Sequence, residues 1–229
     1  MGHPAVSERQ GGNKITGQTQ IQAAMILSPQ EILAALRRTR LPILWMALAY
    51  LAGASTGALL VHAHNSFALN YRDRLVGRAY QSDPAAISLS RGHWARAAAT
   101  DFAGNLLAGA VPSTIMGLSV VLPFPVAAYR GWVGGIVSVD GRHTSRLADP
   151  HERAYYLGVL VLQLIPYTLA GASGVRLGLA FVLPHSRWAY SSPQRWLGLP
   201  AEGLRDVLRI YALVVPLFLI ASVVEFAAR

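Results

Sequence analysis

Histidines are the residues of this chain whose spacing could hold a catalytic metal ion. A zinc-protease motif, His-Glu-x-x-His, begins at His151 but requires a second histidine where the chain has Tyr155. His62 and His64 lie two residues apart, with no third ligand at a useful spacing. The chain has no cysteine, which excludes thiolate ligands and a cysteine nucleophile. We therefore expect no metal site and no cofactor.

A serine is the second candidate for chemistry. The residues from Gly171 to Gly174 read Gly-Ala-Ser-Gly, which matches the Gly-x-Ser-Gly pattern of rhomboid-type intramembrane proteases. That reaction needs a membrane-embedded histidine to accept the proton of Ser173, and the next histidine, His185, falls in a polar loop. We interpret Gly171 and Gly174 as a small-residue face for close helix packing, and we expect no enzymatic activity.

A third feature is a set of polar side chains inside or at the ends of apolar segments. They are Asn105, Arg130, Gln163, Arg176 and Glu225. Such residues cost free energy in hydrocarbon, so they tend to face a helix bundle or a wet cavity. Two interpretations stay open: the groups pair with one another or reach the headgroups, or they line a path for a solute. Glu225 can pair with Arg229 at helical spacing, or it can turn inward toward Arg130 or Arg176.

The composition indicates that lipid surrounds much of the chain. Hydrophobic residues make up 53% of it and charged residues only 14%, whereas soluble domains carry about a quarter. The mean hydropathy is +0.36. The net charge of +9 comes without a basic stripe interleaved with aromatic residues. We therefore expect lipid headgroups, and not nucleic acid, to be the counter-ions.

Five apolar stretches predict an all-α, polytopic transmembrane helix bundle with interfacial amphipathic helices. The predicted spans are about 41–61, 102–121, 126–139, 155–172 and 207–226. Gly53 and Gly57 give the first span a small-xxx-small packing face. A Leu-Pro-Phe-Pro sequence between the second and third spans predicts a hinge. The third span is short and contains Arg130, so a re-entrant or broken helix stays open as an alternative.

The segments outside the spans complete the predicted organisation. Residues 1–27 are polar and predict a flexible tail, and 28–40 predict an amphipathic helix on the membrane surface that leads into the domain 41–229. The mixed segment 62–101 could form another interfacial helix. Arginines before the first span place the N-terminus in the cytoplasm. Lysine and arginine divide evenly between the two sides, so charge orients the first span alone.

Three stretches resemble stage II sporulation protein M-like membrane proteins, over roughly residues 40–229. They are VVPLFLIASVVEFAAR, AGNLLAGAVPSTIMGLSVVLPFPVAAYRGWVGG and PYTLAGASGVRLG. The family's Asn-Gly reads Arg130-Gly131 here, and its His-Gly followed by Glu reads Val161-Leu162-Gln163 and Leu164-Ile165-Pro166. The resemblance implies a helical protein of a prokaryotic inner membrane without known enzymatic activity. The sporulation member works with peptidoglycan-degrading partners, and wider members look accessory or permease-like.

Three functions follow as hypotheses. The first is a non-catalytic subunit or scaffold of a larger membrane complex, with other membrane proteins (in a hetero-complex or a homo-oligomer) and lipids as partners. The alternative is a permease or transport subunit with a polar cavity between broken helices. A membrane-embedded hydrolase that uses Ser173 is a third and weaker hypothesis.

Overall fold

The computed structural model describes residues 28–227, and these are all-α, as predicted. The elements are α2 (Pro29–His62), α3 (Ser66–Ser82), α4 (Pro84–Ser90), α5 (Trp94–Ala103), the π-helix η1 (Gly104–Ala110), α6 (Val111–Gly117), α7 (Pro123–Ile136), α8 (Pro150–Val182), β1 (Arg195–Trp196), β2 (Leu199–Pro200) and α9 (Ala201–Ala227). The two short strands pair antiparallel. The predicted tail 1–27 and Arg229 lie outside the described residues.

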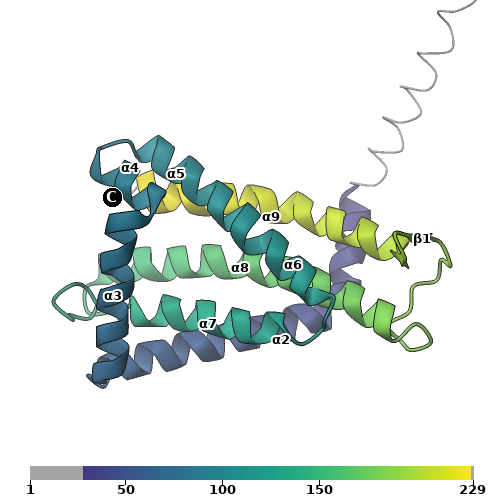
Figure 1. The fold of residues 1–229 in the computed structure, drawn as a ribbon, viewed down its shortest axis with the longest axis horizontal. Helices are drawn as coiled ribbons and strands as arrows, with labels where there is room; N and C mark the ends of the chain where they lie inside the picture. Colours follow the sequence, from purple (N-terminus) through teal and green to yellow (C-terminus); the bar gives the residue numbers. More distant parts are fainter. Residues whose placement is uncertain (1–27, 228–229) are drawn as a thin grey trace, which may run out of the picture.

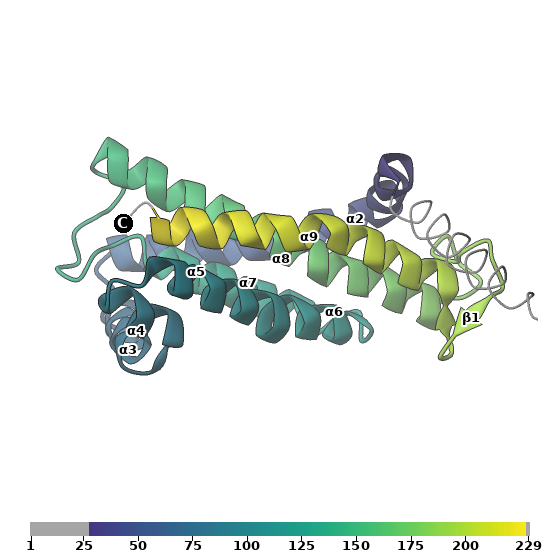
Figure 2. The same ribbon diagram turned by 90° about the horizontal axis from the view of Figure 1, so that it is seen from above.

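The long helices lie side by side along one axis (Figures 1 and 2). Figure 1 shows α3 lying across one end of them, whereas α5, η1 and α6 run obliquely from that end toward the other. We call the first end, with α3, α4 and the loop 137–149, the α3 end. The opposite end, with β1, β2 and the start of α9, is the β1 end. Along the chain, α2, the segment from α5 through η1 to α6, and then α7, α8 and α9 alternate in direction between these two ends (Figure 1).

Among residues 28–227, three helices are long and apolar enough to cross a membrane: α2, α8 and α9. This indicates a membrane protein, but it is fewer than the five predicted spans. The predicted span 126–139 is a 14-residue helix that starts at Pro123, and a full crossing takes about 20 residues. The predicted span 102–121 is divided among α5, η1 and α6 and ends at Gly117.

The predicted surface helix 28–40 and the predicted span 41–61 form one helix, α2. It begins with a capped first turn, because the hydroxyl of Ser28 accepts a hydrogen bond from the amide of Glu31 at 3.3 Å and Pro29 starts the helix. Pro42 lies inside α2. A proline removes one backbone hydrogen bond and bends a helix, and α2 changes direction along its length in Figure 1.

Glycines allow α2 and α7 to approach backbone to backbone. A Cβ added at Gly53 would overlap the carbonyl of Ala128, and one at Gly57 would overlap the carbonyl of Trp132. The face is reciprocal, since a Cβ at Gly131 would overlap the carbonyl of Tyr50. These small residues therefore serve a contact inside the bundle.

Further glycines let α8 pack closely against neighbouring helices beyond residue 172, where the predicted span ends. A Cβ at Gly174 would overlap the carbonyl of Thr114 on α6, and Gly117 faces the backbone of Gly174 in return. Gly171 lies against the side chain of Met46. Buried packing on both sides holds this stretch helical through Val182 despite its glycines.

Candidate functional site

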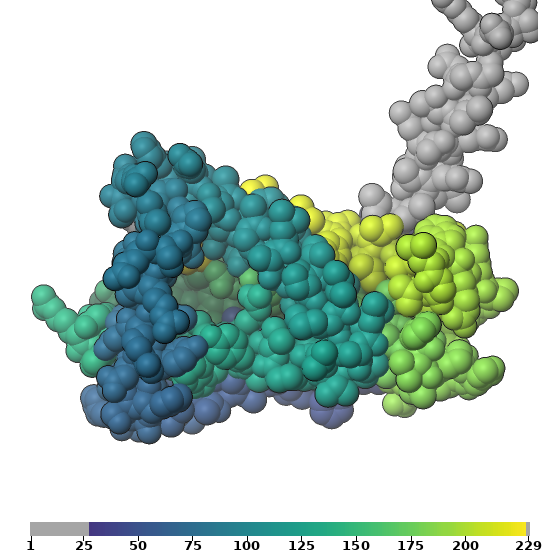
Figure 3. All heavy atoms as spheres, in the orientation of Figure 1, coloured from purple at the N-terminus to yellow at the C-terminus, as the bar shows by residue number. Residues whose placement is uncertain are grey.

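A cavity of about 540 Å³ lies at the α3 end. Its walls come from α3, α4, α5, α7, α8, α9 and the loop 137–149. The hollow beside α3 in Figure 3 opens into it, with atoms of α8 visible in its depth. Its volume falls within the range of roughly 300–1,000 Å³ that is typical of small-molecule sites.

Two arginines line the cavity. Arg72 on α3 is only 5% exposed, and its Nη1 donates to a carboxylate oxygen of Asp73 at 2.9 Å. Arg146 comes from the loop 137–149 and is half-buried. Within residues 28–227, the Nε atoms of Arg72 and Arg146 are both buried without a hydrogen-bond partner. This part of the wall therefore carries guanidinium groups with unused donors.

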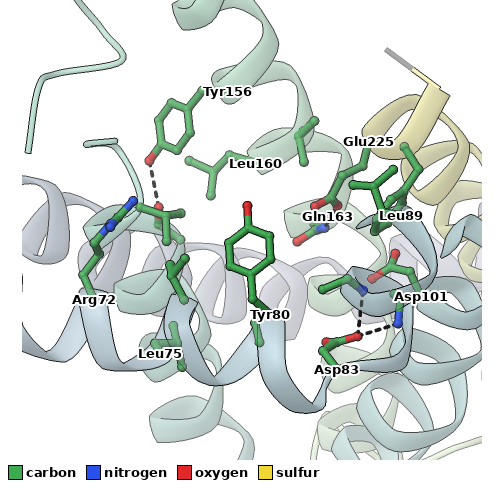
Figure 4. Close-up of a pocket in the computed structure, with 18 of the residues that line it drawn as sticks. Arg72, Leu75, Tyr80, Asp83, Leu89, Asp101, Tyr156, Leu160, Gln163 and Glu225 are labelled. Atoms are coloured by element: carbon green, nitrogen blue, oxygen red, sulfur yellow. Dashed lines mark hydrogen bonds between the residues drawn. The ribbon is translucent and has the colours of Figure 1, made fainter. Parts of the chain in front are cut away.

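Carboxylates line another part of the wall. Asp101 on α5 accepts hydrogen bonds from Asn105 Nδ2 at 2.8 Å and from the hydroxyl of Ser222 at 2.7 Å. Glu225, one turn after Ser222 on α9, accepts one from Gln163 Nε2 at 2.7 Å. Figure 4 shows Arg72 on one side of the cavity and Glu225 and Asp101 on the other, with Tyr80 between them. Arg72 is thus separated from these two carboxylates across the cavity.

Local hydrogen bonds position these groups. Asp83 ends α3 and caps α4, where its carboxylate accepts from the amides of Ala85 at 2.7 Å and Ala86 at 3.4 Å. Asp140 holds the loop 137–149 in a tight turn by accepting from the amides of Thr144 and Arg142, each at 2.8 Å. These two bonds hold the pKa of the Asp140 carboxyl below its usual value.

Four of the five predicted intramembrane polar residues lie in one connected region. Gln163 and Glu225 bond to each other and line the cavity. Asn105 continues from Asp101 into the bundle, where its Oδ1 accepts from the hydroxyl of Tyr167 at 2.5 Å. The guanidinium carbon of Arg130 lies 4.1 Å from the centre of the Tyr167 ring, a cation–π contact. A polar path therefore leads from the cavity toward the middle of the bundle.

Arg176 is not part of that region. It lies near the β1 end, where its Nη1 donates to the carbonyl of Trp188 at 2.6 Å and its guanidinium carbon lies 4.2 Å from the centre of the Tyr190 ring. The hypothesis that Glu225 turns toward Arg176 is therefore wrong. The reason is topological, because α8 and α9 are antiparallel and carry these two residues to opposite ends (Figure 1).

An ion-pair network lies at the β1 end and was not predicted from the sequence. Nε and Nη2 of Arg38 donate to the two carboxylate oxygens of Asp206 at 2.7 and 2.6 Å. Arg209 reaches the same carboxylate at 2.9 Å and that of Glu31 at 2.5 Å. The i, i+3 spacing of Asp206 and Arg209 was a visible signal, but their link to Arg38 spans 168 residues.

Ser173 and His62 are the residues that the sequence offered for catalysis or metal binding. Ser173 is 2% exposed, and its hydroxyl donates to the carbonyl of Ala170 in its own helix at 2.8 Å. His62 Nε2 lies 2.8 Å from the hydroxyl of Ser145. Over the part of the chain that the structure describes, no group of three histidine, aspartate or glutamate side chains could hold a metal ion.

We compared the chain with protein families, with curated proteins and with solved structures. No family model matches the chain, and no curated protein and no solved structure matches it. The resemblance to stage II sporulation protein M-like membrane proteins therefore stays a prediction.

Proposed function

We propose that this chain is a multi-pass membrane protein that admits a small polar solute to the cavity at the α3 end, as a permease or a transport subunit. The observation that carries the proposal is the continuity of polar groups from the cavity into the bundle. Gln163 and Glu225 line the cavity, and Asn105 leads from its wall toward Arg130. Intramembrane polar residues are costly, and they typically pair with one another inside the bundle or mark the path of a solute.

The same proposal includes five membrane passes, with the N-terminus in the cytoplasm of a prokaryotic cell. Support comes from the helix directions: α2, the segment from α5 through η1 to α6, α7, α8 and α9 run alternately toward the α3 end and toward the β1 end (Figure 1). The second pass is interrupted by a π-helix and the third is short. π-Helices are frequent at functional sites, and transporters often use broken helices around a binding site.

The subunit or scaffold hypothesis stays a prediction. One of its motives, the small-residue faces, weighs less here, because Gly53, Gly57 and Gly174 contact other helices of the same chain. A transport subunit can still assemble with other membrane proteins. Purification in a mild detergent tests this, and recovery of a lone monomer with no co-purifying protein would count against it.

The absence of cysteine from the sequence makes the cavity directly testable, since a single introduced thiol gives the whole labelling signal. Ala86→Cys lines the cavity, whereas Leu48→Cys lies on an exposed apolar face of α2. We expect a membrane-impermeant maleimide to label Ala86→Cys in intact cells and to leave Leu48→Cys unlabelled. Leu197→Cys at the β1 end should label only after the membrane is opened. An unreactive Ala86→Cys would refute an open cavity.

Transport itself is tested in proteoliposomes loaded with a mixture of labelled small metabolites. Gln163→Leu and Glu225→Gln should slow release of the transported compound. Arg176→Gln is the matched control, because Arg176 is a buried intramembrane arginine away from the cavity. Release that is the same in all three variants and in the unaltered chain would contradict a path through Gln163 and Glu225.

A further inference from the structure

We propose that the cavity at the α3 end binds a zwitterion: a compound with a cationic amine at one end and an anionic phosphate or carboxylate at the other. The inference rests on the proposed function, because it names the ligand class of the same cavity. The compound can be a free solute or the headgroup of a zwitterionic lipid, since both present the same two charges.

The anion belongs beside the arginines. Arg72 is 5% exposed, and its ion pair with Asp73 uses only Nη1, while its Nε is buried and unpartnered in the described chain. The Nε of Arg146 is also buried and has no hydrogen-bond partner among the described residues. A buried donor without a partner costs free energy. A phosphate or carboxylate accepts the forked hydrogen bonds that guanidinium groups offer, so it would satisfy both side chains.

The amine belongs beside the carboxylates. Asp101 accepts hydrogen bonds from two uncharged groups, Asn105 and Ser222. Across residues 28–227, no arginine, lysine or histidine forms an ion pair with Asp101 or Asp83. Glu225 adds a third carboxylate to the same wall. An ammonium group would supply the cation that Asp101 lacks and donate to its remaining lone pairs.

The arrangement of the walls favours one molecule with two charges over two separate ions. Figure 4 shows Tyr80 and Leu160 between Arg72 and the acidic wall. Apolar side chains, among them Leu75, Leu89 and Leu160, complete the lining. A short apolar linker between the ligand's two charged ends suits this middle part. A ligand with one charge would neutralise one wall and leave the other unchanged.

Binding to the purified full-length chain in detergent tests the inference by calorimetry. The probe is O-phosphoethanolamine, and the single-charge controls are ethanolamine and inorganic phosphate. We expect O-phosphoethanolamine to bind at least about tenfold more tightly than either control. Arg72→Gln should weaken it to the level of ethanolamine, and Asp101→Asn to the level of inorganic phosphate. Arg146→Gln, at a half-buried position, repeats the arginine test if Arg72→Gln fails to fold.

Arg91→Gln is the matched control, because Arg91 is exposed and does not line the cavity. It should leave binding unchanged. A lipid arm uses nanodiscs and native mass spectrometry. If the ligand is a headgroup, the chain should retain phosphatidylethanolamine over phosphatidylglycerol, and Arg72→Gln and Asp101→Asn should each abolish that preference.

The inference is overturned if no tenfold preference for O-phosphoethanolamine over both controls appears and phosphatidylethanolamine is not preferred over phosphatidylglycerol. It is also overturned if Arg91→Gln weakens binding as much as Arg72→Gln. Either result leaves the proposed function standing when Ala86→Cys is labelled and the flux variants behave as expected. An unlabelled Ala86→Cys refutes the proposed function and the inference together.

Discussion

The two ends of the bundle use the same residue types in opposite ways. At the β1 end, Arg38 and Arg209 converge on Asp206, which is 2% exposed and accepts from both of them. At the α3 end, Arg72 and Asp101 lie on different walls of a cavity and do not meet. A closed network stabilises a contact between helices, whereas separated charges leave binding capacity for a ligand. Charge alone does not distinguish the two roles, but the arrangement of partners does.

The largest expected effect is at the closed network. Asp206→Ala leaves two buried or half-buried guanidinium groups without their shared carboxylate, and breaking such a pair costs about 3–5 kcal/mol. We expect the free energy of unfolding to fall by about 3 kcal/mol, because Arg38 keeps some solvent contact. Equilibrium unfolding in detergent, followed by circular dichroism, measures it. A loss below about 1 kcal/mol would show that the network is not structural.

A smaller loss is expected where α2 supports the α3 end. Gly57→Val would push α7 away from α2, because even a Cβ overlaps the carbonyl of Trp132. Overpacking of this kind costs about 1–3 kcal/mol, measured by the same unfolding experiment. Gly158→Ala on α8 is the control, since a Cβ there meets nothing within 4 Å. It should stabilise the helix by up to about 1 kcal/mol.

The open charges of the α3 end predict a change of function without a change of stability. Asp101→Asn keeps a side chain that can bond to Asn105 and Ser222 while it removes the charge. We expect its unfolding free energy to stay within about 0.5 kcal/mol of the unaltered chain, with solute release from proteoliposomes strongly reduced. A stability loss as large as that of Asp206→Ala would erase the distinction between the two ends.

The smallest effect is a pH dependence confined to the α3 end. In the folded chain, hydrogen bonds from the backbone amides of Thr144 and Arg142 hold the pKa of Asp140 below its ordinary value of 3.8. A lowered folded-state pKa gives stability that is present above 3.8 and lost as the pH falls through the folded value. The loop 137–149 should therefore be cut faster by pepsin at about pH 3 than at about pH 5.

Asp140→Asn controls for the change in the protease itself, because it removes the titrating group. Its loop should show a smaller pH response than the unaltered chain. Equal responses in the two chains would rule out Asp140 as the cause.

Local signals in the sequence predicted the helical class and several helix features. The helix predicted to begin at residue 28 and the packing glycines of the first span follow from patterns within a few residues of each other. Of the five predicted spans, only three correspond to helices long enough to cross a membrane, because apolarity does not show that η1 and the turn after Gly117 divide a stretch. Helix length depends on how neighbouring segments pack.

The candidate site was predicted only in part. Gln163 and Glu225 were identified because a polar residue in an apolar stretch is conspicuous. Arg72 and Arg146 were missed as site residues, since they fall in polar segments where arginine is ordinary. Their importance appears only when α3 and the loop 137–149 fold over the end of the bundle. Tertiary placement, and not residue type, separates them from the other surface arginines.

The bond between Arg38 and Asp206 also constrains biogenesis. A ribosome releases the segment that carries Arg38 first and the segment that carries Asp206 only after 168 more residues. Arg38 on α2 therefore has no partner from α9 until that last helix has been made. A nascent chain truncated before α9 would lack both carboxylates that pair with Arg38, those of Asp206 and Glu202.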